Sequence, residues 1–134
     1  MAVIEPNKPK PCKRYLVRIA GMDRTGFLAY TENYNETAEG CTNEPGKCGC
    51  THAEINLLKV MEYPYRVIIS HSPCLDCAKA LVAADVEQVY YIACYRMDDG
   101  LNHLKENNIY TEQITIKGDE GLYWDDIIKY IQTH

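Results

Sequence analysis

The chain lacks the features of a membrane protein or of a protein that coats nucleic acid. No apolar run approaches the roughly 20 residues that a membrane-spanning helix needs. The first residues, which include Pro6, Pro9 and Pro11, do not resemble a signal peptide. A positive net charge is also missing: the formal charge is −5 at pH 7, which argues against a broad basic surface for long nucleic acids. We therefore expect a cytoplasmic protein without a membrane partner or a stably bound nucleic acid.

Internal repeats, low-complexity tracts and linkers are absent as well. The 134 residues are 46% hydrophobic and 25% charged, an ordinary globular composition for a chain long enough to bury a core. Residues 1–11 are proline-rich and have no helical periodicity, so we interpret them as an extended arm. We expect residues 1–134 to form a single domain.

Strand and helix patterns alternate after the arm. The sequence predicts a hairpin with strands near 14–20 and 26–31, a helix at 51–61, a strand at 65–70, a helix at 73–84, a strand at 87–94, a helix at 98–107, a strand at 109–116 and a closing helix at 121–132. The polar segment 33–49 between them is long for a connection, and such loops often carry function or a metal. This order predicts a three-layer α/β/α fold with a mixed five-stranded sheet.

Two of the predicted helices begin at residues suited to a helix start. Thr51 is expected to cap the first, with Glu54 at the third helical position as in a capping box. Pro73 suits the first turn of the second helix. The first helix should bury the apolar stripe formed by Ile55, Leu57, Leu58 and Met61. Both helices should begin at the same end of the sheet, where their positive ends favour thiolates and can bind a substrate carbonyl.

These two helix starts together predict a catalytic metal site. Enough chain separates His52 from Cys74 for one helix and one strand. Cys74 and Cys77 form a C-x-x-C pair at a helix start, a spacing at which two thiolates can bind one zinc ion. One imidazole and two thiolates leave the fourth position of a tetrahedral zinc for water, as in catalytic sites. Glu54 would lie beside that water without binding the metal.

Each motif alone has a simpler interpretation. A C-x-x-C pair could equally be a redox pair or half of a zinc knuckle, and an H-x-E could be a solvated helix start whose acidic residue complements the helix dipole. The joint pattern, H-A-E followed by P-C-x-x-C, is much rarer. It is typical of zinc-dependent nucleobase deaminases.

At these residues the chain resembles the cytidine deaminase superfamily, and more narrowly the phage-type deoxycytidylate (dCMP) deaminases. His52 as the nitrogen ligand fits the nucleotide and tRNA-editing branches, since free-cytidine deaminases typically have a cysteine there. Ser72 begins an S-P-C that is similar to that of dCMP deaminases, whereas tRNA adenosine deaminases typically show E-P-C. The likeness continues through Cys77–Leu81 and Val89–Tyr95. Residues from about 13 to the end can be aligned, although only the zinc motifs are highly specific.

The resemblance implies hydrolytic deamination of dCMP to dUMP and ammonia, which supplies dUMP for thymidylate synthesis. Zinc held by His52, Cys74 and Cys77 would lower the pKa of its water. Glu54 would take that water's proton, deliver it to N3 of the base and then protonate the departing amine. If a phage encodes the protein, the reaction would take place in the host cytoplasm.

Substrate contacts also follow from the resemblance. The Ala53 N–H would bind the base carbonyl and the Ser72 carbonyl would bind the exocyclic amine. Asn35, in a segment similar to the family's G-Y-N-G, would bind the sugar hydroxyl. For the phosphate, Arg96 after Tyr95 is the candidate, and its rivals are Lys13, Arg14 and Arg24.

The chain departs from the family at its N-terminus and in the sugar-binding segment. The family's opening helix is replaced by the proline-rich arm. Asn33 and Glu36 stand where G-Y-N-G has glycines, which puts regulation by dCTP and dTTP in doubt. The likeness suggests a homo-oligomer, such as a hexamer. The sequence leaves open whether the base is plain cytosine or a 5-substituted one.

Seven cysteines in an intracellular chain argue for metal rather than disulfides. Cys94, inside an apolar run, is interpreted as a buried strand thiol. The other four cysteines outside the catalytic motif are either free thiols or a second, closed zinc site, and some phage members of the family hold a second zinc in this region. These four are Cys12, Cys41, Cys48 and Cys50.

Two other functions remain open at this stage. A polynucleotide deaminase acting on tRNA or single-stranded DNA would need basic and aromatic surface, against which the net charge and the S-P-C motif argue. A non-catalytic zinc module would have no use for Glu54.

Overall fold

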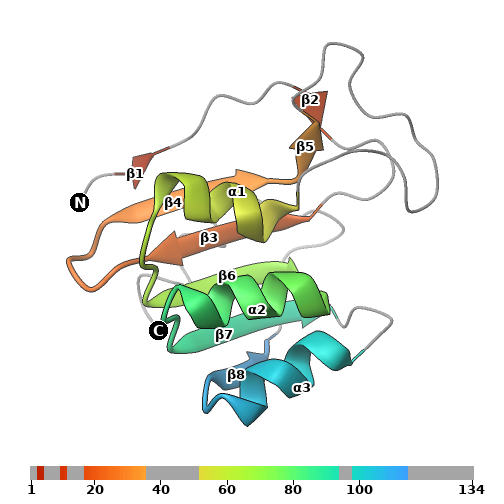
Figure 1. Ribbon diagram of the computed structural model, residues 1–134. Helices are drawn as coiled ribbons and strands as arrows, with labels where there is room; N and C mark the ends of the chain where they lie inside the picture. The colour runs from red at the N-terminus through yellow and green to blue at the C-terminus, as the bar shows by residue number, and fades with distance from the viewer. Residues whose placement is uncertain (1–2, 5–9, 12–16, 36–51, 94–97, 115–134) are drawn as a thin grey trace.

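A mixed sheet with three helices on one face forms the described part of the chain (Figure 1). The computed structural model describes residues 3–4, 10–11, 17–35, 52–93 and 98–114. The closing helix expected at 121–132 lies outside these residues. None of the described helices is long and apolar enough to cross a membrane.

The sheet has the strand order β1-β4-β3-β6-β7-β8. Its strands are β1 (Val3–Ile4), β3 (Arg18–Met22), β4 (Leu28–Glu32), β6 (Arg66–His71), β7 (Gln88–Ala93) and β8 (Tyr110–Gln113). Strand β3 is antiparallel to both β4 and β6, whereas β6, β7 and β8 run parallel. The mixed five-stranded sheet is therefore confirmed, and the two-residue β1 extends it beside β4. Strands β2 (Lys10–Pro11) and β5 (Tyr34–Asn35) form a separate antiparallel pair.

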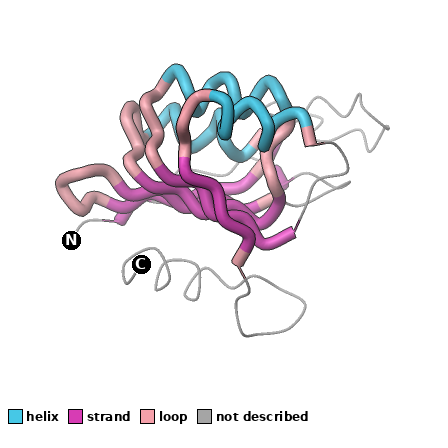
Figure 2. Tube along the Cα trace, turned by 90° about the horizontal axis from the view of Figure 1, so that it is seen from below, coloured by secondary structure: helices cyan, strands magenta, loops and turns pink. Residues whose placement is uncertain are grey.

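Helices α1 (Ala53–Val60), α2 (Leu75–Ala83) and α3 (Asp99–Glu106) all cover the same face of the sheet (Figure 2). Each contributes one fully buried leucine to the core between the layers, at positions 57, 81 and 104. Fully burying such a side chain stabilises the fold by about 1.5–3 kcal/mol. In β6, Val67, Ile68 and Ile69 are all buried, as is typical of a central strand. The α/β class is confirmed.

The helix starts differ in detail from the sequence prediction. His52, not Thr51, is the N-cap of α1, which makes Glu54 the second helical residue rather than the third. Cys74 is the N-cap of α2, so Pro73 lies one residue before the helix rather than in its first turn. Neither cap side chain bonds its own helix. The predicted capping was wrong because these side chains are directed at each other instead.

The buried face of α1 also differs from the predicted apolar stripe. Leu57 and Met61 are buried as expected, whereas Ile55 is only half-buried and the polar Asn56 is fully buried. Gly21 on β3 explains part of how α1 is turned toward the sheet. A Cβ there would lie 2.8 Å from Leu57 Cδ2, so the missing side chain lets α1 settle directly onto the strand.

Candidate metal and catalytic site

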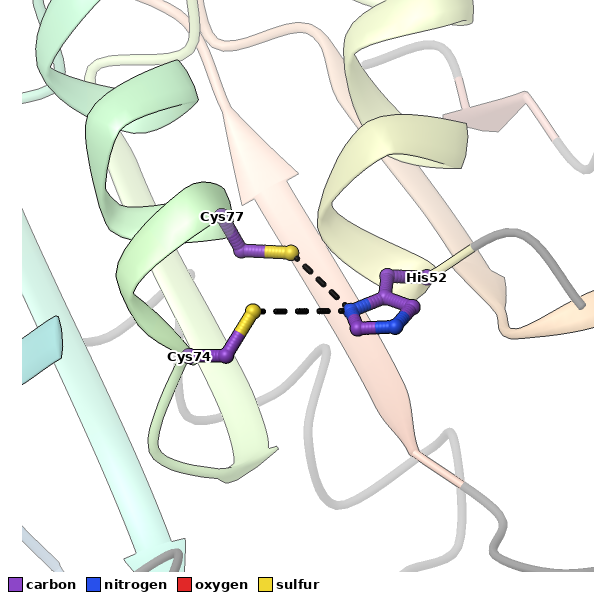
Figure 3. Close-up of side chains that lie close together, drawn as sticks. All are labelled: His52, Cys74 and Cys77. Carbon is purple, nitrogen blue, oxygen red and sulfur yellow. Dashed lines mark hydrogen bonds between the residues drawn. The ribbon is translucent and has the colours of Figure 1, made fainter. Parts of the chain in front are cut away.

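Three predicted ligands converge where α1 and α2 begin (Figure 3). His52 caps α1, Cys74 caps α2, and Cys77 lies in the first turn of α2. The Nδ1 atom of His52 is 3.2 Å from Cys77 Sγ and 3.6 Å from Cys74 Sγ, and all the ligand atoms lie within 4.8 Å of one another. Ligands about 2.0–2.3 Å from a tetrahedral zinc are separated by roughly 3.3–3.8 Å. The donor types and their separations therefore fit one zinc ion.

The sheet brings these helix starts together. Strand β6 ends at His71, and the Ser72 N–H donates to the Ala93 carbonyl at the end of the neighbouring parallel strand β7, at 2.9 Å. The chain then enters α2 at Cys74. Parallel strands send their following segments to the same edge of a sheet, and helix α1 begins beside that edge. Both starts present the positive end of a helix dipole to the thiol groups.

The two thiols differ in acidity. Hydrogen bonds from the Cys77 thiol and then from His52 lower the pKa of Cys74 to about 4. The pKa of Cys77 is raised, first by its hydrogen bond to the Cys74 thiolate and then by burial. A Cys74 thiolate would therefore accept a hydrogen bond from the Cys77 thiol. Metal binding at this pair would release that remaining proton.

Glu54 lies next to the three ligands without being one of them. Its side chain is only 4% exposed, and burial raises its pKa to about 7. The carboxyl group contacts the Cys77 thiol. A carboxyl group with a pKa near neutrality can both accept and release a proton at physiological pH, as a general acid–base group must.

Burial increases across the site from one side to the other. His52 is exposed and Cys74 is half-buried, whereas Cys77 and Glu54 are buried. The trio is therefore exposed on the His52 side, and Glu54 lies on its buried side. This gradient suits a site that admits a substrate but keeps its acid–base group away from bulk water.

Asn56 is a residue near the site that sequence reasoning missed. Its side chain is fully buried, and its Nδ2 donates to the Glu32 carbonyl at the end of β4, at 2.9 Å. The hydrogen bond fixes the start of α1 to the strand that leads into residues 33–35. The apolar stripe predicted from sequence did not include Asn56, so no periodic pattern indicated that this polar side chain is buried and needs a partner.

Asn33, which stands at a glycine of the family's G-Y-N-G, anchors the end of β4. Its N–H donates to the Val17 carbonyl at 3.1 Å, and its Oδ1 accepts from the Val17 N–H at 2.9 Å. This two-point contact gives the asparagine a structural role of its own. The backbone of Asn35 follows in β5.

His71, close to the site in sequence, packs at the end of its strand. Its Nδ1 lies 2.9 Å from Ser70 Oγ, and that hydroxyl accepts the Arg18 N–H at 2.9 Å. Burial lowers the pKa of His71. His71 is therefore held at the end of β6 by its neighbour Ser70.

The remaining predicted site residues separate into three groups. Ala53 and Ser72 are buried beside the ligands. Arg24 follows β3 at the opposite end of the sheet, where Met22 pairs with Arg66 at the start of β6, so we no longer consider it a phosphate ligand. Outside the described residues lie Cys12, Lys13, Arg14, Cys41, Cys48, Cys50, Cys94, Tyr95 and Arg96.

The chain belongs to the cytidine and deoxycytidylate deaminase family. Residues 24–93, more than half of the chain and including all three ligands, match that family's zinc-binding region. No curated protein sequence matches the chain.

Among solved structures, the chain is similar to the dCMP deaminase from the cyanophage S-TIM5. The structure of that enzyme in complex with dCMP and dUMP is 28% identical and has a TM-score of 0.64 over 77% of this chain and 84% of the other. Its apo form is 27% identical, with a TM-score of 0.61 over 78% and 85%.

Proposed function

We propose that the protein catalyses the zinc-dependent hydrolytic deamination of dCMP to dUMP and ammonia. The observation that carries this proposal is the buried carboxyl group of Glu54 beside the His52, Cys74 and Cys77 side chains. Closed structural zinc sites have four protein ligands and need no adjacent acid–base group. The likeness to a deaminase solved with dCMP and dUMP supports a pyrimidine nucleotide as substrate.

His52, Cys74 and Cys77 would hold the zinc ion, which would supply a water molecule of lowered pKa. Glu54 accepts a proton from the attacking water at a carboxylate oxygen and delivers it to N3 of the cytosine ring. The water oxygen bonds to C4, and the C4–N4 bond then breaks. Glu54 then passes the second proton of the former water molecule to the departing amine, which leaves as ammonia. One carboxyl group serves both transfers because delivery of the first proton to N3 restores the carboxylate, which then takes the second proton from the new C4 hydroxyl.

Backbone groups beside the ligands orient the base. Ala53 is the first residue of α1, so its N–H has no acceptor within the helix and is free to bind the base carbonyl. The Ser72 carbonyl accepts a hydrogen bond from the exocyclic amine, and Asn35 binds the sugar hydroxyl. Arg96 is our proposed contact for the phosphate, and the preceding Tyr95 is a further proposed substrate contact.

Several related expectations remain proposals. We propose a second zinc ion at Cys12, Cys41, Cys48 and Cys50, a homo-oligomeric assembly and a cytoplasmic location, on the basis of the sequence and its resemblance to the family. Zinc quantification and a measurement of size in solution would test the first two.

The test of the reaction is ammonia release from dCMP, CMP, deoxycytidine, dCTP and 5-methyl-dCMP, with zinc per chain measured on the same sample. We expect dCMP to be turned over fastest. Faster turnover of 5-methyl-dCMP would move the assignment to a 5-substituted substrate. Zinc-loaded protein that turns over no mononucleotide would contradict the proposal and favour a polynucleotide substrate or a binding module.

A second experiment tests the role of Glu54. Glu54→Gln should lower kcat by roughly 10²–10⁴-fold, the usual effect of a general acid–base group, while zinc content stays unchanged. The matched control is Glu62→Gln, the same substitution at an exposed position just after α1. It should retain full activity. Full turnover by Glu54→Gln would refute the mechanism.

A further inference from the structure

The first turn of α3 contacts the backbone that carries the ligand Cys74. Gly100 is the second residue of this helix and is buried. A Cβ atom at Gly100 would lie 2.0 Å from the Pro73 carbonyl oxygen and 2.9 Å from the Cys74 carbonyl oxygen. Real Cβ atoms essentially never come within 3.0 Å of such a neighbour. Because both obstacles are backbone atoms, they cannot rotate away as the end of a side chain could.

Helix formation alone does not explain a glycine at this position. Glycine is a poorer helix former than alanine, so local propensity would favour a side chain at residue 100. The close approach explains it, since only a residue without Cβ lets α3 lie directly on the Pro73–Cys74 peptide. Helices α2 and α3 also pack side by side (Figure 1).

The segment Ser72–Cys74 is held from two other sides. The Ser72 N–H donates to the Ala93 carbonyl of β7 at 2.9 Å, and the Cys74 carbonyl accepts from the Ala78 N–H of α2 at 2.9 Å. The contact with Gly100 adds a third side. The position of Cys74 Sγ relative to His52 therefore depends on a strand, on its own helix and on α3.

We propose that Gly100 is a positioning residue for the metal site: its missing side chain lets α3 support the Pro73–Cys74 backbone and thereby fixes the ligand Cys74. The inference rests on the proposed function because it assumes that His52, Cys74 and Cys77 bind zinc. An alanine at residue 100 must displace the loop or the helix by about 1 Å to reach an allowed contact. Groups that orient metal ligands without touching the metal typically change metal affinity by about 10–100-fold when altered.

The test uses the full chain carrying Gly100→Ala, with metal affinity as the readout. Zinc affinity is measured by competition with a chromophoric chelator, and the geometry of the thiolates is read from the charge-transfer bands of the Co²⁺-loaded protein. We expect zinc affinity to fall by at least about tenfold, with altered cobalt–thiolate bands. Wild-type affinity together with an unchanged cobalt spectrum would overturn the proposal.

Two control variants separate positioning from general destabilisation. Gly26→Ala makes the same substitution at the far end of the sheet, where φ is +88° and there is open space, so it strains the backbone without touching the zinc loop. Leu101→Ala removes a buried side chain from α3 itself. Both should lower stability yet bind zinc within about twofold of wild type. An equal loss of zinc affinity in all three variants would also overturn the proposal.

If Gly100→Ala does not fold, amide hydrogen exchange on the wild-type protein provides the test. Coupling is reciprocal: if α3 favours the metal-bound arrangement, then metal must stabilise α3. Zinc should therefore slow exchange at Asn102, whose N–H donates to Asp98 within this helix, more than at Gly26 in the distant turn. Equal slowing at the two amides would overturn the proposal. Zinc binding without dCMP turnover would refute the proposed function and leave this inference standing, so the two failures are distinguishable.

Discussion

The two ends of the sheet carry the same kind of charged residue in opposite surroundings. At one end Glu54 is buried against the candidate zinc ligands, and burial raises its pKa to about 7. At the other end the Glu87 side chain is 51% exposed and forms an ion pair with Arg24, whose side chain is 59% exposed. Arg24 also lies over the Tyr65 ring, 5.1 Å from its centroid. Glu54 lies near the start of α1, and Glu87 directly precedes β7.

The difference shows that environment, rather than residue type, decides what a carboxyl group can do. Water solvates a charge at the surface and weakens its interaction with any partner. Removal from water destabilises the charged form, so that a proton can be gained or lost near neutral pH. The same burial lowers stability, and it is tolerated at functional sites. The predictions below test this contrast between a reactive end and a solvated end.

The largest effect should come from a ligand at the reactive end. Cys77→Ala removes a buried thiol from the trio, and we expect zinc affinity to fall by well over 100-fold, since changes outside the ligand set alone cost about 10–100-fold. Turnover should fall to background. Zinc per chain and ammonia release measure both effects. Asp76→Asn, at the exposed neighbouring residue of α2, is the matched control and should change neither.

The next effect concerns the cost of burying Glu54. Its pKa is higher in the folded protein than its ordinary value of 4.5, so the unfolded chain loses the proton first. Glu54 therefore makes stability decline as pH rises from about 4.5 to about 7, and above that the loss is complete. In metal-free protein at pH 8, Glu54→Gln should raise the free energy of unfolding by about 1–3 kcal/mol.

Urea unfolding in the presence of a chelator measures this gain at pH 5 and at pH 8. The gain should be small at pH 5, because the carboxyl group is then protonated in the folded state. Glu62→Gln, at an exposed position, should change stability little at either pH. A gain that is equal at the two pH values would show that packing rather than charge burial is responsible.

Removing a buried hydrogen bond at the reactive end should lower the free energy of unfolding. The loss should be comparable to, or smaller than, the gain expected for Glu54→Gln. Asn56→Ala leaves the Glu32 carbonyl without the amide that now donates to it at 2.9 Å. We expect a loss of about 1–3 kcal/mol in the free energy of unfolding. Asn102→Ala on the exposed face of α3 is the matched control, and it should cost much less. Equal losses would argue that the Asn56 contact contributes little.

The sequence was sufficient to predict that His52, Cys74 and Cys77 lie together, because its signals were local. H-A-E and P-C-x-x-C each precede an apolar helix, and alternating strands bring those helix starts to one edge of the sheet. The sheet and the three described helices were predicted for the same reason, with boundaries shifted by a few residues. The segments with four further cysteines, the phosphate candidates and the closing helix lie outside the described residues, so those expectations remain predictions.

Features that depend on tertiary contacts were not predictable in this way. Thr51 looked like a cap from sequence, but cross-helix contact between His52 and the cysteines places the cap one residue later. Neither the buried partner of Asn56 nor the backbone contact of Gly100 leaves a periodic pattern. Both depend on which strand or loop lies opposite, and that is fixed only by the assembled fold.

The smallest effect should come from the solvated end. Replacing Arg24 and Glu87 by alanine, singly and together, gives a double-mutant cycle for their ion pair. We expect a coupling energy of about 0.2–1 kcal/mol that shrinks as salt is added, because both side chains are more than half exposed. Arg24→Ala should cost slightly more than Glu87→Ala, since it also removes the contact with the Tyr65 ring. Turnover of dCMP should be unchanged in all three variants. A salt-insensitive coupling well above this range, or a loss of turnover, would mean that the two ends of the sheet are energetically linked, and the contrast between them would then fail.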